Sequence, residues 1–267
     1  MWIHTPWNIS ESVKKIAEDR DINIQVPTSK FKKSLQAAYD LEKLAIEKGV
    51  KIVEPFQGTS AFNNKIHVLG PDLDYYYELV AQFGDSVGGL SFASLFEKVI
   101  NSITELWHED QLVDPEDNAV SARNNSSVIT LIQLDKTFLF LGDSGVPAIS
   151  RAADYADASN FDLASQVRYV QVPHHGSKRN LGPTILNRII GSIVEKGNKI
   201  NKNAFISAAP DSPNHPSKRV INSFIRRGVD INHTCGQDHC YQSDGLPIRP
   251  GWVPLIPLEF YETYDED

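Results

Sequence analysis

The sequence has few cysteines and no long apolar segment. Of its 267 residues only Cys235 and Cys240 are cysteines, which excludes a disulfide framework and suits a reducing cytoplasm. The longest apolar runs, such as SSVITLIQL and TFLFLG, have the length of strands, whereas a membrane helix needs about 20 residues. The N-terminal MWIHTPWNIS also lacks the basic and apolar regions of a signal peptide. We therefore expect a cytoplasmic protein that makes no contact with membranes.

Positive charge is also in deficit, and the formal net charge is −8 at pH 7. This balance argues against a surface that coats nucleic acid, although a local basic patch is compatible with it. Hydrophobic residues make up 41% of the chain, which is enough for a sizeable core. We expect a single domain over residues 1–267, and we see no internal repeat.

Helices and strands alternate along the chain. The apolar periodicity predicts helices over 10–20, 33–49, 75–83, 90–110, 151–156, 183–196 and 217–228. It predicts strands over 2–6, 50–55, 65–71, 126–134, 137–142, 167–172, 203–209 and 230–234, and an exposed loop over 111–125. The helix over 33–49 has an apolar stripe formed by Leu35, Ala38, Leu41, Leu44 and Ala45. A two-residue link at 135–136 indicates a hairpin, so we expect an α/β fold with a mixed sheet.

Three consecutive strands of the second half are each followed by residues that bind metal or move protons. LFLGDSG places Asp143 beyond one strand, VQVPHHGS places His174 and His175 beyond the next, and SAAPDSPNHPS places Asp211 and His215 beyond the third. Because successive strand-end loops can meet at one edge of a sheet, we expect these residues to share a cleft. A carboxylate with several imidazoles is typical of zinc, manganese or iron sites. Each motif alone is equally compatible with an ordinary turn, and it is the series of three that favours a metal site.

The series NNSSVITLIQLDKTFLFLGD, VQVPHHGS and NHPS resembles the metallo-β-lactamase superfamily. The similarity is greatest to the hydrolase domain associated with the competence protein ComEC and to its free-standing relatives. The upstream KIHVLGP and the tyrosine-rich segment after it are also similar, so the resemblance covers most of the chain. It implies an αββα sandwich with mixed sheets and a hydrolytic site at one edge that holds one or two zinc ions, with manganese as the other option.

The resemblance also implies roles for individual residues. Asp143 resembles the carboxylate that bridges two metals, and it would be both a ligand and a catalytic residue. His175 resembles a later metal-ligand histidine, and His174 would lie beside the site in a catalytic or substrate-contacting role. The expected substrate-binding residues are Ser177, Lys178 and His215.

The main ligand motif of the superfamily, His-x-His-x-Asp-His, has no counterpart in this sequence. His4 is the only histidine before His67, and WIHTPW resembles the strand that follows this motif in relatives. We therefore expect an N-terminally incomplete domain with two protein ligands, where catalytic zinc sites use three or more. Many relatives have a further ligand histidine at the position of Asn124, Asn125 and Ser127.

Two functions from different classes follow from this resemblance. One is a metal-dependent hydrolase that attacks a phosphodiester or related ester, of a small molecule or of nucleic acid, with a metal-activated water. The other is a non-catalytic domain of the same fold that serves as a binding or structural module. Strands that an absent segment would cover should expose apolar surface, which favours a homo-oligomer.

A serine protease is a further enzyme class to consider. LGDSGVP resembles the GDSGGP stretch of trypsin-like proteases, with Ser144 as nucleophile and His4, His67 or His108 as base. The long predicted helices and Val146 in place of the second glycine argue against this class.

HTCGQDHC contains four side chains of zinc-ligand type within eight positions: His233, Cys235, His239 and Cys240. Their spacing differs from that of common structural zinc sites, so we favour a turn with two reduced cysteines.

Overall fold

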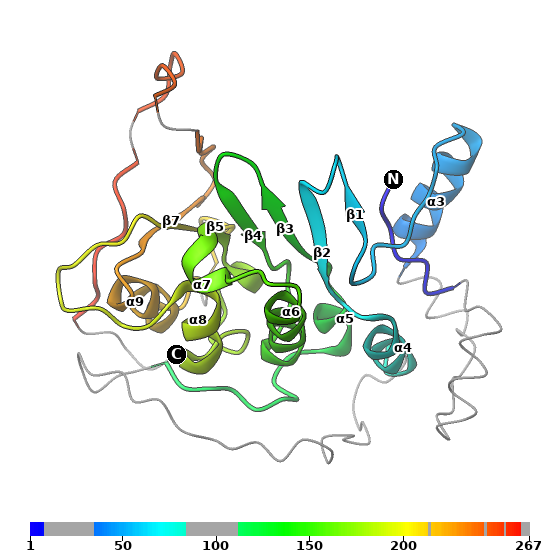
Figure 1. The fold of residues 1–267 in the computed structure, drawn as a ribbon, viewed down its shortest axis with the longest axis horizontal. Helices are drawn as coiled ribbons and strands as arrows, with labels where there is room; N and C mark the ends of the chain where they lie inside the picture. The colour runs from blue at the N-terminus through cyan, green and yellow to red at the C-terminus, as the bar shows by residue number, and fades with distance from the viewer. Residues whose placement is uncertain (8–34, 84–111, 213–214, 243–244, 254, 263–267) are drawn as a thin grey trace.

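A seven-stranded mixed sheet forms the centre of the molecule (Figure 1). The computed structural model describes residues 1–7, 35–83, 112–212, 215–242, 245–253 and 255–262. The strands lie in the order of the sequence: β1 (Ser60–Ala61), β2 (Ile66–Gly70), β3 (Ile129–Gln133), β4 (Thr137–Phe140), β5 (Val167–Gln171), β6 (Asn203–Ile206) and β7 (Asp230–His233). Strands β1 to β4 are antiparallel, and β4 to β7 are parallel. The predicted α/β class, mixed sheet and β3–β4 hairpin are confirmed.

The helices connect these strands and flank them. They are α3 (Gln36–Glu47), α4 (Leu73–Ala81), α5 (Ala122–Asn125), α6 (Val146–Ala158), α7 (Leu163–Gln166), the 3-10 turn η1 (Pro173–Gly176), α8 (Pro183–Ile190) and α9 (Lys218–Arg226). Each pair of parallel strands needs a crossover, and α6, α8 and α9 lie in the three crossovers between β4 and β7. Figure 1 shows α4, α5, α6, α8 and α9 in a row along one side of the strands.

The core lies between the sheet and these helices. One in-register row crosses five strands, and all its members are at most 1% exposed: Leu131, Leu139, Val170, Ala204 and Ile231. Apolar side chains of α6, α8 and α9 pack in the same cluster. Because side chains alternate between the faces of a strand, this row fixes which face of every strand is turned to the helices.

The opposite face of the sheet is aromatic. Phe138 and Phe140 of β4 lie 5.4 and 5.9 Å from the ring centroid of Tyr169 on β5, and Tyr169 stacks on Phe205 of β6 at 5.2 Å. Tyr241, from the segment after β7, packs against Tyr169 at 5.1 Å. The two faces of the sheet therefore differ, because helices cover one and aromatic rings cover the other.

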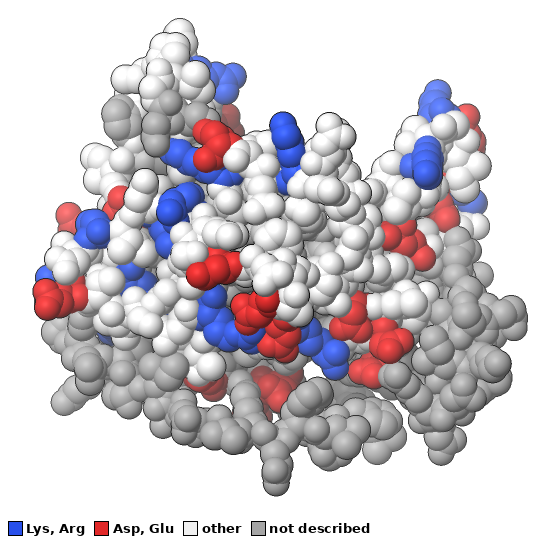
Figure 2. Space-filling model, in the orientation of Figure 1, with Lys and Arg blue, Asp and Glu red and all other residues white. Residues whose placement is uncertain are grey.

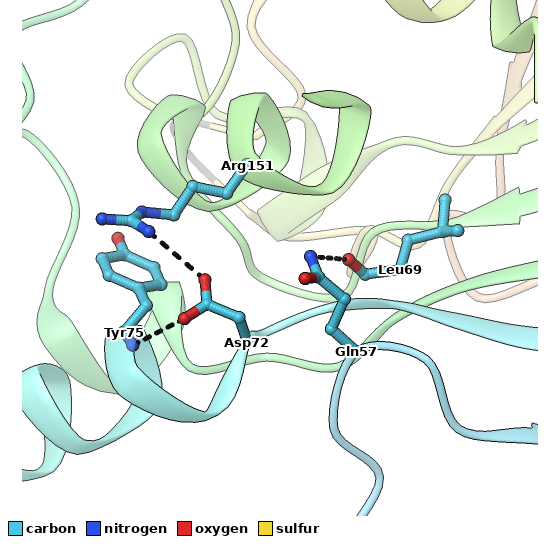
Figure 3. A network of polar contacts seen from close by, with 5 residues as sticks. All are labelled: Gln57, Leu69, Asp72, Tyr75 and Arg151. Atoms are coloured by element: carbon cyan, nitrogen blue, oxygen red, sulfur yellow. Dashed lines mark hydrogen bonds and ion pairs between the residues drawn. The ribbon is translucent and has the colours of Figure 1, made fainter. Parts of the chain in front are cut away.

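Asp72 joins the start of α4 to α6 (Figure 3). Its Oδ1 accepts a hydrogen bond from the Tyr75 N–H at 2.9 Å, and its Oδ2 pairs with Arg151 Nη1 at 3.3 Å. The Arg151 guanidinium lies 4.4 Å from the centroid of the Tyr75 ring. Nearby, Gln57 Nε2 donates to the Leu69 carbonyl at 3.0 Å. The Asp72 contacts join α4 to α6, and the Gln57 contact joins the segment before β1 to β2.

Several local predictions are wrong. The helix predicted over 183–196 ends at Ile190, because Gly191 adopts a φ of 104° that is incompatible with a helix. In the described part of the chain, the strands predicted over 2–6 and 50–55 are reduced to one isolated bridge, between Trp2 and Val53. The loop predicted over 111–125 contains α5, in which Asn125 is buried. The helices predicted over 10–20 and 90–110 lie outside the described residues.

The apolar stripe predicted on α3 is only partly buried. Ala45 is 5% exposed, whereas Leu41 and Leu44 are 47% and 49% exposed. The buried side of the helix also contains Glu42, which accepts a hydrogen bond from Trp7 Nε1 at 2.6 Å. The inward side of α3 therefore combines an apolar contact at Ala45 with a polar contact at Glu42.

Replacing Leu139 by alanine tests the central row. Because the side chain is 1% exposed and packed on all sides, we expect Leu139→Ala to lower the free energy of unfolding by about 2–5 kcal/mol. Leu134→Ala is the control, because Leu134 is 57% exposed, and it should change the free energy by less than about 0.5 kcal/mol. Urea unfolding followed by circular dichroism measures both, and equal losses would contradict the described core.

His4 is a buried imidazole whose protonation opposes folding. Its ring stacks on Tyr76 at 4.3 Å and lies 4.8 Å from Phe56, and neither ring nitrogen has a hydrogen-bond partner in the described part of the chain. Burial lowers the pKa of His4 from 6.5 to about 4. Between these values the unfolded chain binds a proton that the folded chain does not, so stability present above pH 6.5 is lost as the pH falls toward 4.

We expect His4→Phe to reduce this pH dependence. Between pH 7.5 and 4 the wild type should lose roughly 3 kcal/mol more unfolding free energy than the variant, the amount that linkage gives for this pKa shift. Urea unfolding at several pH values measures the difference, and parallel curves for the two proteins would refute it.

Candidate functional site

The loops after β4, β5 and β6 meet at one edge of the sheet. The His174 N–H donates to the Gly142 carbonyl at 3.1 Å, which joins the first loop to the second. The Ser217 N–H donates to the Gly176 carbonyl at 3.0 Å, which joins the second to the third. The rings of His174, His175 and His215 lie together, with centroids 5.7 to 6.4 Å apart. We call these three histidines and Asp143 the histidine edge.

Both histidines of the PHHG turn have left-handed backbones. His174 has φ 43° and ψ 54°, and His175 has φ 57° and ψ 23°. Gly176 continues the run with φ 79°. Left-handed conformations cost energy in residues other than glycine and are found where the surroundings enforce them, often at functional sites. The turn therefore fixes the two imidazoles in positions that a relaxed loop would not adopt.

Gly176 also allows the third loop to approach. A Cβ atom at this residue would lie 2.8 Å from the Cβ of Pro216 and 3.3 Å from Cγ2 of Ile206. Both distances are shorter than ordinary contacts between carbon atoms. Because Gly176 has no side chain, the loop that carries His215 can approach the histidine turn.

Hydrogen bonds determine which nitrogen of each neutral imidazole carries the proton. His174 Nδ1 lies 3.1 Å from Asn180 Oδ1, while Asn180 Nδ2 donates to the carbonyls of Asp143 and Ser144 at 2.9 and 3.1 Å. His175 Nδ1 lies 2.5 Å from the carbonyl of Ser207. Both acceptors have no proton to donate, so Nδ1 is the donor in both rings. The neutral rings therefore carry their lone pairs on Nε2, which is the form that binds metals or accepts protons.

The loop that carries Asp143 is held by its backbone. Gln171 Oε1 accepts from the N–H groups of Leu141 and Gly142 at 2.9 and 2.8 Å. Ser127 Oγ accepts from the Asp143 N–H at 3.2 Å, and Asn125 Oδ1 accepts from the Gly145 N–H at 2.9 Å. Within the described part of the chain, the half-buried Asp143 carboxylate has no hydrogen bond or ion pair. Its oxygens are thus available to a ligand.

The other predicted site residues lie around this edge in different settings. Ser177 is 5% exposed, and its hydroxyl accepts from the Arg179 N–H at 3.2 Å, so it stabilises the turn. Lys178 is half-buried, and Arg179 is exposed. Asp211 is exposed on the third loop. Asn125 and Ser127, for which the sequence resemblance implied a position near the metal, support the Asp143 loop.

Sequence reasoning missed Asn180 and Gln171. Each makes hydrogen bonds to backbone groups 29 to 37 residues away, and no periodicity or motif marks such contacts. The one sequence feature that could have indicated Asn180 is its position directly after the HHGSKR run.

The described residues do not support the protease arrangement. Ser144 is 0% exposed, and its Oγ has no hydrogen-bond partner in this part of the chain. A serine nucleophile needs a base within hydrogen-bond distance, whereas His4 packs on Tyr76 and His67 on Phe161. His108 lies outside the described residues.

The donor chemistry of the histidine edge fits zinc or manganese at Asp143 and His175. An available carboxylate and an Nε2 lone pair are ligands that both metals accept. In the described ranges, however, no group of three or more His, Cys, Asp or Glu side chains converges so as to hold a metal, and this includes the segment with the free cysteines Cys235 and Cys240. The described residues alone therefore do not form a complete metal site.

Charge on the visible face is mixed. Figure 2 shows acidic and basic side chains interspersed rather than gathered by sign. Arg188 of α8, for example, pairs with Asp154 and Asp157 of α6 at 2.8 and 2.6 Å. In the residues that the structure describes, every helix is too short or too polar to span a bilayer.

Comparison of the chain with protein-family models, curated proteins and solved structures found no match. The geometry of the histidine edge and the sequence motifs that form it are therefore what indicates a function.

Gly176→Ala tests the close approach of the loops. Gly197→Ala is the matched control, because Gly197 has a φ of 92° but a Cβ atom added there would have open space within 4 Å. Both variants carry the cost of a left-handed alanine, but only Gly176→Ala adds a steric clash. We expect it to lower the free energy of unfolding by about 1–3 kcal/mol more than the control. Equal losses in urea unfolding would show that the loops are not in contact there.

Proposed function

We propose that the histidine edge is a hydrolytic site of the metallo-β-lactamase type that acts on a phosphodiester or a related ester. The observation that carries this proposal is that several polar atoms of the edge have no hydrogen-bond partner within the described residues. Hydrogen bonds at Nδ1 leave the Nε2 lone pairs of His174 and His175 available, and the adjoining loop carries the Asp143 carboxylate, which has no partner among the described residues. A strained backbone at both histidines is consistent with a functional constraint.

The asymmetry of the sheet supports the proposed fold type. In an αββα sandwich each sheet carries helices on one face and packs against a second sheet on the other. The described sheet has its helices on the face of the Leu139 row and rings such as Phe138 and Tyr169 on the other. We propose that this aromatic face is the side on which a second sheet would pack.

Asp143 and His175 are the residues that would hold zinc or manganese. When bound, the metal would supply hydroxide at neutral pH and polarise the ester under attack. His174 Nε2 would accept a proton from water, or donate to a phosphate oxygen once protonated. Lys178, Arg179 and His215 would contribute positive charge or hydrogen bonds to a phosphate at the rim.

One observation favours the second function, a non-catalytic binding or structural module of the same fold. Among the described residues no group of three or more His, Cys, Asp or Glu side chains could hold a metal, whereas a catalytic zinc site uses three protein ligands or more. A site of this kind would bind metal weakly and turn over little substrate.

Metal titration and a hydrolysis assay test both functions. Isothermal titration with Zn²⁺ and with Mn²⁺ should show weak binding that Asp143→Ala and His175→Ala each reduce by about tenfold or more, because a ligand is lost. His239→Ala is the control, since it removes a histidine outside the edge, and it should leave binding unchanged.

Cleavage of bis-p-nitrophenyl phosphate then separates the two functions. Metal-dependent cleavage that Asp143→Ala abolishes supports the hydrolase, whereas metal binding without cleavage supports the module. Binding that survives both ligand substitutions would refute a metal site at this edge.

A further inference from the structure

Asn180 is fully buried at the centre of the histidine edge. It is 0% exposed, and its side chain bridges two of the three loops. Oδ1 faces His174 Nδ1 at 3.1 Å, while Nδ2 donates to the carbonyls of Asp143 and Ser144. Its own N–H donates to the Ser177 carbonyl at 3.2 Å, which fixes the start of the side chain.

The orientation of this amide is determined by its partners. The reverse orientation would place Oδ1 against two carbonyl oxygens and leave three acceptors facing one another in a buried site. Such an arrangement would forfeit two hydrogen bonds and leave buried acceptors unsatisfied. Nδ2 therefore faces the two carbonyls, and Oδ1 accepts from His174.

We propose that Asn180 is a positioning residue that sets the tautomer and ring orientation of His174 and locks the Asp143 loop to the histidine turn. The backbone of His174 is fixed by its bond to the Gly142 carbonyl, and the amide fixes the ring. Nε2 is then the only nitrogen of the neutral ring with a lone pair. The consequence for catalysis rests on the proposed hydrolase, but the positioning itself does not.

Nuclear magnetic resonance of the metal-free chain measures this role directly. Long-range ¹H–¹⁵N spectra of histidine-labelled protein distinguish the two neutral tautomers, and at about pH 8 most imidazoles are neutral. In the wild type His174 should be in the Nδ1–H form. In Asn180→Leu the ratio of Nδ1–H to Nε2–H at His174 should fall by about tenfold, because the acceptor is lost.

Asn222→Leu is the matched control. Asn222 is 1% exposed, and its amide also bridges two segments, through hydrogen bonds with Tyr261 N–H and carbonyl at 2.9 and 2.8 Å. It lies on α9 and bonds to neither histidine of the turn, so the tautomer of His174 should not change. His175, whose Nδ1 bonds to the Ser207 carbonyl, should keep its tautomer in all the proteins and serves as an internal reference.

Asn180→Asp separates the two parts of the proposal. A carboxylate still accepts from His174 Nδ1, so the tautomer should be kept, but it cannot donate to the carbonyls of Asp143 and Ser144. We therefore expect faster amide hydrogen exchange in 141–145 with an unchanged His174 signal. An Nε2–H signal in the wild type, which needs no variant to fold, or an unchanged ratio in folded Asn180→Leu would overturn the proposal. Absence of hydrolysis in the wild type, with these signals as expected, would count against the hydrolase alone.

Discussion

The pairing register of the parallel strands is the constraint on which the rest of the structure depends. The row from Leu131 to Ile231 buries one residue of each strand against the helices. A shift of one residue would turn these side chains to the aromatic face and bring bulky rings such as Phe138 and Tyr169 to the helix-facing side. The same register places the ends of β4, β5 and β6 level with one another, and the three loops of the histidine edge start from those ends. Packing far from the edge thereby sets the spacing of its histidines.

Side-chain amides determine the path of the loops beyond the ends of the strands. Gln171, Asn125 and Asn180 satisfy backbone groups of the Asp143 loop that lack partners in helix or sheet. Buried N–H and carbonyl groups need such partners, because leaving them unpaired costs about 1–3 kcal/mol each. The polar loops at the edge are therefore shaped from within the protein, and a ligand is not required to hold them.

The elements that sequence reasoning predicted well are those set by local patterns. The β3–β4 hairpin follows from two apolar runs with a two-residue link, and α9 follows from its apolar period and the glycine at its end. Helix α6 begins five residues before its predicted start at Arg151, because the extended Gly145 is its N-cap and Pro147 lies in its first turn. The left-handed conformation of His174 and His175 and the bonds of Asn180 depend on segments distant in the sequence. No local pattern could indicate them.

The hydrogen bonds that hold the Asp143 loop fix its backbone and do not involve the Asp143 side chain. Every bond from Asn125, Ser127, Gln171 and Asn180 to this loop ends on a main-chain atom. A different side chain at position 143 would consequently leave the path of the loop intact. The reactive side chain at this position can therefore change without rebuilding the backbone that presents it.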